Sequence, residues 1–168
     1  MGETLYFRDN FFSAGTTEIF NKDEVKVGEL DLKSAFSASV DVLNLDRKII
    51  ISGKFPLFSN KWLVTNALEE EVGILKQNFT FLSKKYQYTT DSRGVYSIES
   101  EAFSYQYEIF GEQSNLVAKF EKVSGFFSSP AYRLENLSKE VSSEEWVAVV
   151  MGINAIQKRR RNASNASV

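Results

Sequence analysis

Apolar and polar residues alternate along most of the chain, in short runs that are rich in Val, Ile, Tyr and Phe. Residues 25–30 are one such run, and a period of two is the pattern of a half-buried β-strand. Residues 4–12 are expected to form the first strand, residues 13–17 a turn, and residues 132–136 the last strand. Between them, strand pairs with polar turns begin near residues 39, 62, 86 and 105, which predicts a meander of hairpins.

The chain departs from this pattern near its C-terminus, where residues 146–153 contain no charge and no hydroxyl group. A helix that is apolar on every side must be surrounded by other protein. The β-branched residues in this segment suit a buried strand. The capping-box spacing of Ser142 and Glu145, and the return of apolar residues at Ala155, favour a helix. We therefore predict a helix over residues 143–157.

A third interpretation of this segment is a transmembrane anchor, but crossing a bilayer takes about 20 apolar residues and the segment is shorter. A buried helix would instead pack its side chains against strands on all sides. The residues predicted to make this central packing are Trp146, Val147, Val149, Val150, Ile153 and Ile156.

An antiparallel sheet of about a dozen strands tends to close on itself, which removes its exposed edges. The predicted fold is mainly β: a closed antiparallel barrel of about twelve strands that encloses one hydrophobic C-terminal helix. Residues 1–158 are expected to form this single domain, and residues 159–168 a polar, disordered tail.

Composition excludes several functional classes. The chain has 168 residues, a formal net charge of −2, and neither Cys nor His. The charge argues against a general nucleic-acid binder. The two missing residue types exclude thiolate nucleophiles, His-based triads, and metal sites that use these ligands. No G-x-S-x-G or Gly-rich phosphate loop occurs, so we expect neither an enzyme nor a bound metal or cofactor.

The N-terminal residues 1–9 carry charges where a secretion signal would have an apolar core. The absence of cysteine agrees with a reducing compartment. We therefore expect a cytoplasmic protein, which can lie peripherally at the inner face of the membrane.

A run of four cations is the strongest local charge feature, and it consists of Lys158, Arg159, Arg160 and Arg161. One interpretation is a contact with anionic lipid head groups or phosphate. The simpler interpretation is that these cations complement the negative end of the helix dipole and keep the chain soluble. Both remain open at the level of sequence.

Several stretches resemble the tubby C-terminal-like superfamily, and in particular the LURP-one-related family with its small bacterial members. They are Trp-Leu-Val-Thr-Asn at 62–66 before Glu-Val-Gly-Ile-Leu at 71–75, Tyr-Glu-Ile-Phe-Gly at 107–111 before Leu-Val-Ala-Lys-Phe at 116–120, and Trp-Val-Ala-Val-Val-Met-Gly-Ile at 146–153. The resemblance extends from about Leu5 to Lys158 and implies a twelve-stranded barrel around a hydrophobic helix. Distant relatives include tubby, a phosphoinositide-binding module, and the phospholipid scramblases.

The resemblance carries over a fold and no functional residue. Relatives often have a turn Asp followed by Gly, where this chain has Asn-Ala-Leu-Glu-Glu at 66–70. No stretch matches the lipid-binding basic residues of tubby or the calcium-binding segment of the scramblases. The leading hypothesis is a non-enzymatic binding or scaffold module for anionic phospholipid, phosphoinositide or a protein partner. The alternatives are a barrel that carries an apolar ligand and an unrecognised carboxylate-based enzyme.

Overall fold

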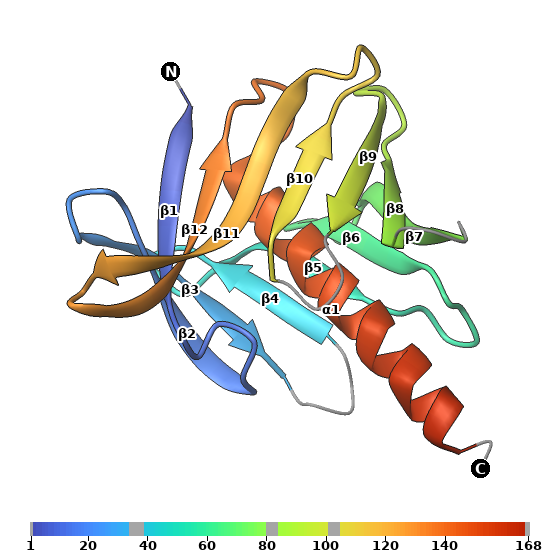
Figure 1. Ribbon diagram of the computed structural model, residues 1–168, viewed down its shortest axis with the longest axis horizontal. Helices are drawn as coiled ribbons and strands as arrows, with labels where there is room; N and C mark the ends of the chain where they lie inside the picture. Colours follow the sequence, from blue (N-terminus) through green and yellow to red (C-terminus); the bar gives the residue numbers. More distant parts are fainter. Residues whose placement is uncertain (1, 34–38, 80–83, 101–104, 167–168) are drawn as a thin grey trace.

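The computed structural model describes residues 2–33, 39–79, 84–100 and 105–166, which form twelve strands and one helix (Figure 1). The elements are β1 (Glu3–Arg8), β2 (Gly15–Phe20), β3 (Lys26–Leu32), β4 (Ser39–Leu43), β5 (Ile49–Lys54), β6 (Trp62–Asn66), β7 (Glu71–Phe79), β8 (Lys84–Thr89), β9 (Val95–Ser100), β10 (Tyr107–Phe110), β11 (Leu116–Phe126), β12 (Ser129–Asn136) and α1 (Ser143–Asn165).

Each strand pairs antiparallel with its neighbours in sequence, and β1 pairs with β12 to close the barrel. Leu5 lies opposite Leu134 in this closing pair, and both side chains are buried. The closed antiparallel barrel with one C-terminal helix confirms the predicted fold class. Closure gives each of the twelve described strands a neighbour on both sides.

Asparagine organises three of the hairpin turns. The side-chain oxygen of Asn66 accepts hydrogen bonds from the backbone amides of Leu68 and Glu70, at 2.9 and 3.0 Å. Asn21 and Asn44 make the same pair of bonds in the β2–β3 and β4–β5 turns. Such a side chain substitutes for backbone hydrogen bonds in a turn. The turn after β6 therefore needs no Asp-Gly pair, although Glu69 adopts a positive φ of 61° there.

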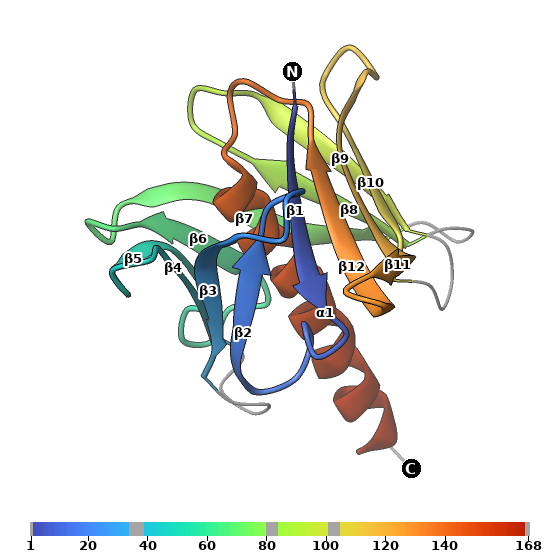
Figure 2. The same ribbon diagram turned by 90° about the vertical axis from the view of Figure 1, so that its left-hand side faces the viewer.

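The helix α1 passes through the barrel, and Figures 1 and 2 show the strands on opposite sides of it. Ser142 is its N-cap and accepts a hydrogen bond from the backbone amide of Glu145. All six residues that were predicted to make the central packing are buried: Trp146, Val147, Val149, Val150, Ile153 and Ile156. The apolar segment is therefore a buried core helix, which explains why it lacks a polar face.

Two glycines make room for the largest side chain that packs against this helix. The indole of Trp62 in β6 lies against Gly53 in β5 and Gly152 in α1. Its Nε1 donates a hydrogen bond of 3.1 Å to the carbonyl oxygen of Ala148. A Cβ atom on either glycine would lie within 2.7 Å of three indole atoms. The two glycines therefore fix how closely the helix approaches the sheet.

The structure differs from the sequence-based expectation at both ends of the chain. The first strand ends at Arg8, and the segment expected to be a turn at 13–17 already contains the start of β2 at Gly15. The helix continues to Asn165 rather than ending near residue 157, so residues 159–165 are helical and not a disordered tail. No Gly or Pro interrupts the segment after Gly152, and its Lys and Arg residues have high helix propensity.

Candidate functional site

The four predicted cations lie where α1 leaves the barrel. Lys158 is half-buried at the rim, whereas Arg159, Arg160 and Arg161 are exposed. Figures 1 and 2 both show the C-terminal part of α1 projecting beyond the strands. The last turn of the helix contains no basic residue. The dipole interpretation therefore loses its basis, because the effect of a helix terminus falls off within one turn.

Arg159 connects this helical projection to the loop between β5 and β6, residues 55–61. Its guanidinium carbon lies 3.8 Å from the centroid of the Phe55 ring, in a cation–π contact. Its Nη1 donates a 2.7 Å hydrogen bond to the carbonyl oxygen of Ser59. The two contacts hold the loop and the cations together as one surface, which we call the basic end.

The tip of this loop exposes two large apolar side chains. Leu57 is 89% exposed and Phe58 is fully exposed. Phe58 also has a positive φ of 59°, which is a rare backbone conformation for a bulky residue. Lys54 and Lys61 are exposed at the base of the loop. The sequence analysis missed this tip, although Phe-Pro-Leu-Phe between two strands was a visible signal because apolar residues are unusual in a turn.

Inside the barrel at the same end, two tyrosines face Gln157 of α1. The Gln157 side-chain amide donates a 3.1 Å hydrogen bond to the Tyr86 hydroxyl. Burial raises the pKa of Tyr86, and the nearby Arg160 opposes that rise. The Tyr107 hydroxyl is buried and makes no hydrogen bond of normal geometry among the described residues. Burial raises the pKa of Tyr107 as well, although Gln157 lies near enough to oppose it.

A second polar cluster fixes the other end of the helix. The Glu145 carboxylate in the first turn of α1 accepts two hydrogen bonds from the Arg93 guanidinium, at 2.7 and 2.9 Å, and one from the Tyr88 hydroxyl. Arg93 also donates to the backbone oxygens of Val72 and Glu140. Burial raises the pKa of Tyr88, and the adjacent Glu145 charge adds to this effect. Sequence reasoning gave Glu145 the role of a capping-box side chain, but the carboxylate turns into the barrel instead.

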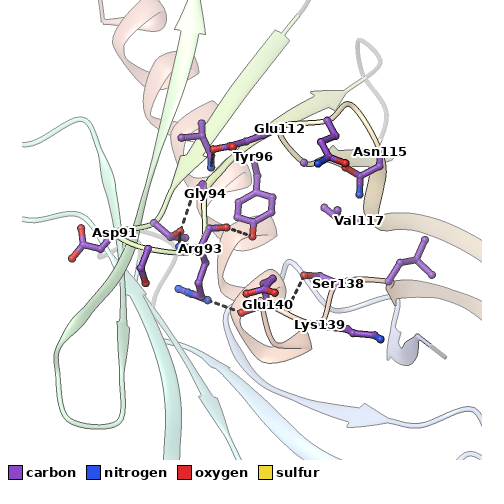
Figure 3. Close-up of a pocket in the computed structure, with 16 residues that line it drawn as sticks. Asp91, Arg93, Gly94, Tyr96, Glu112, Asn115, Val117, Ser138, Lys139 and Glu140 are labelled. Carbon is purple, nitrogen blue, oxygen red and sulfur yellow. Dashed lines mark hydrogen bonds between the residues drawn. The ribbon is translucent and has the colours of Figure 1, made fainter.

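Next to Arg93 the surface has an open hollow of about 830 Å³ (Figure 3). It lies between the β8–β9 turn, the β10–β11 turn and the link from β12 to α1. Tyr96 and Val117 are buried in its lining, and the Tyr96 hydroxyl donates a hydrogen bond to the carbonyl oxygen of Arg93. The Glu112 carboxylate accepts from the backbone amide of Val95 at 3.1 Å. Two of its charged side chains, Arg93 and Glu112, are thus engaged in hydrogen bonds within the protein.

Two features are absent from the described residues, a metal-binding cluster and a membrane-spanning helix. No group of three or more acidic side chains lies close enough together to hold a metal ion among them. In the same parts of the chain, no helix combines the length and the apolar character that crossing a bilayer requires.

Comparisons with known proteins address the fold. No protein-family model matches the sequence, and no curated protein matches it. The structure is similar to the X-ray structure of a protein from Arabidopsis thaliana, AT5G01750, with a TM-score of 0.62. The alignment covers 93% of this chain and 91% of the plant protein, at 8% sequence identity. This likeness extends over nearly the whole barrel, and at such low identity it concerns the fold alone.

Proposed function

We propose that this chain is a non-enzymatic binding module of the LURP-one-related type that attaches reversibly to anionic phospholipid surfaces through its basic end. The observation that carries the proposal is the position of these cations on a helix that extends past the strands: Lys158 lies at the rim, and Arg159 and Arg161 are exposed beyond it. Among the described residues, no carboxylate forms a salt bridge with these three side chains. Arg161 is exposed, and Arg159 keeps further guanidinium N–H groups besides the one bonded to Ser59, so both can meet the phosphate groups of a lipid surface.

The two ends of the barrel differ in charge, and this difference supports an oriented attachment. The turns that lead from even-numbered to odd-numbered strands all lie at the end where α1 begins, because neighbouring strands are antiparallel. The described turns and the link to α1 at that end carry eight acidic side chains, among them the exposed Glu69, Glu70, Glu112 and Glu140, against five basic ones. An anionic surface repels this acidic end and attracts the basic end. A net charge of −2 is therefore compatible with binding to an anionic membrane.

The expected strength is modest. Each cation near an anionic leaflet contributes about 1 kcal/mol, and the effect falls off within a Debye length, about 8 Å at physiological salt. Four cations therefore give an attachment that salt weakens strongly. Such a protein would be cytoplasmic and would reach the inner face of the membrane transiently.

The rival functions fit the geometry less well. A carrier of apolar ligands needs free space inside the barrel, but the side chains of α1 from Trp146 to Ile156 are packed there. A carboxylate-based enzyme needs an acidic group that faces substrate. The most buried carboxylate in the helix, Glu145, is instead held by Arg93 and Tyr88.

Co-sedimentation with vesicles tests the proposal. Wild-type protein should sediment with phosphatidylserine-containing vesicles at low salt, less at physiological salt, and not with pure phosphatidylcholine vesicles. Replacing residues 158–161 by Gln should strongly weaken the binding at low salt, since these cations supply most of the electrostatic attraction. A variant with Lys22, Arg47, Lys48 and Lys139 replaced by Gln has the same net charge and should still bind, because these cations lie at the acidic end. Equal loss in both variants would contradict a localised basic site.

A further inference from the structure

We propose that the tip of the β5–β6 loop, Leu57 and Phe58, inserts into the bilayer interface when the basic end meets a membrane. This inference rests on the proposed function and names the part of the surface that enters the lipid. It adds an apolar contact to the electrostatic one, so part of the binding should survive at physiological salt. One weak membrane signal rarely gives stable attachment, whereas two combined signals do.

The loop exposes its apolar groups in a way that ordinary packing does not explain. Phe58 and Leu57 are the most exposed large apolar residues in the described chain. The side chain of Phe58 is thus fully in water on a backbone of positive φ. A similar positive φ occurs at other turn residues, such as Glu69, so it is the exposure of the Phe58 side chain that distinguishes this turn. Here Arg159 holds the neighbouring residues Phe55 and Ser59.

The charges around the tip favour a lipid surface as the occupant. Lys54 and Lys61 are exposed at the two ends of the loop, and the exposed side chains of Arg159 and Arg161 lie on the adjoining helix. Two exposed apolar side chains close to cations match the chemistry of an anionic interface, where phosphate lies above hydrocarbon. The long stems of Lys and Arg allow the charges to stay at the head groups while the apolar groups go deeper.

A fluorescent side chain at the tip tests the insertion directly. The native Trp62 and Trp146 are completely buried in the core, so their emission reports little on the environment outside the protein. The substitution Phe58→Trp places an indole at the loop tip. The matched control is Leu68→Trp, because Leu68 is 76% exposed at the opposite end of β6. Both variants should melt like the wild type, since neither position belongs to the core.

Emission is recorded with phosphatidylserine-containing vesicles whose phosphatidylcholine is brominated on the acyl chains. The inference predicts a blue shift and quenching for Phe58→Trp and neither change for Leu68→Trp. Vesicle binding without quenching of Phe58→Trp would overturn the insertion and leave the proposed function standing. A failure to bind any vesicle would overturn both proposals.

Removal of the apolar groups gives an independent measure. The double variant Leu57→Ser and Phe58→Ser should weaken the vesicle partition coefficient at physiological salt by about tenfold for each residue. The difference in binding between this variant and the wild type should persist when the salt concentration is raised, because salt does not screen an apolar contact. The control variant Leu45→Ser and Leu68→Ser removes two exposed leucines from turns at the acidic end and should bind as the wild type does. Equal binding by the two double variants would refute insertion.

Discussion

We expect the substitution Gly152→Ala to destabilise the protein, although the same change in an exposed helix stabilises it by about 1 kcal/mol. The new methyl group would lie 2.7 Å from Cγ and Nε1 of Trp62. The indole cannot move away from the new methyl group, because it already packs against Gly53 of the sheet. Its Nε1 also donates a hydrogen bond to the carbonyl oxygen of Ala148. The helix must therefore shift away from β6.

Overpacking of this kind costs about 1–3 kcal/mol, and the confinement of the indole places this site at the upper end. After the gain in helix propensity is subtracted, the net loss should be about 2 kcal/mol. For a domain of this size, that loss lowers the melting temperature by about 4–8 °C. Thermal and urea unfolding followed by circular dichroism measure the change. Asn162→Ala, in the exposed part of α1, is the control and should leave stability nearly unchanged.

A double-mutant cycle identifies the cause. Trp62→Phe alone should destabilise the protein, because it leaves a cavity and removes the hydrogen bond to Ala148. It also removes the indole atoms that the new methyl group would meet. Gly152→Ala should therefore cost less in the Trp62→Phe background than in the wild type. A Gly152→Ala protein that melts at or above the wild-type temperature would refute the proposed packing of helix against sheet.

The buried tyrosines give two further predictions. Tyr107→Phe should leave stability unchanged or raise it by up to about 1 kcal/mol, since the Tyr107 hydroxyl lacks a normal hydrogen bond in the described chain. Tyr88→Phe should lower stability by about 1.5–3 kcal/mol, because it removes a hydrogen bond to the Glu145 carboxylate. Urea midpoints measure both, and a reversed order would contradict the assignment of the two hydroxyls. Burial raises the folded-state pKa of Tyr86, Tyr88 and Tyr107, so the folded state favours their neutral forms. The contribution of these hydroxyls to stability is complete below the unfolded-state pKa of about 10 and is lost as the pH rises above it. Urea midpoints should therefore fall above about pH 10, and a flat profile there would argue against burial of these groups.

The candidate site was only partly visible in the sequence. The run from Lys158 to Arg161 was conspicuous, but its meaning depended on where the helix ends. A helix that stopped near residue 157 would place the cations at the negative dipole end, whereas the observed end at Asn165 leaves them on an exposed projection. Leu57 and Phe58 belong to the candidate site only because the fold places their loop against Arg159, which the sequence does not show.

The sequence by itself determined the architecture of this protein. Alternation with period two specified strands, polar turns separated them into hairpins, and an all-round apolar segment required a buried helix, since each of these signals is local. Only the tertiary structure decided the partners of particular side chains. Arg93 donates to Glu145, 52 residues away, and Arg159 donates to the β5–β6 loop, 100 residues away. Trp62 lies between Gly53 and Gly152 and donates to a helix carbonyl 86 residues away. Such contacts depend on barrel closure and strand register, which no short window of sequence contains.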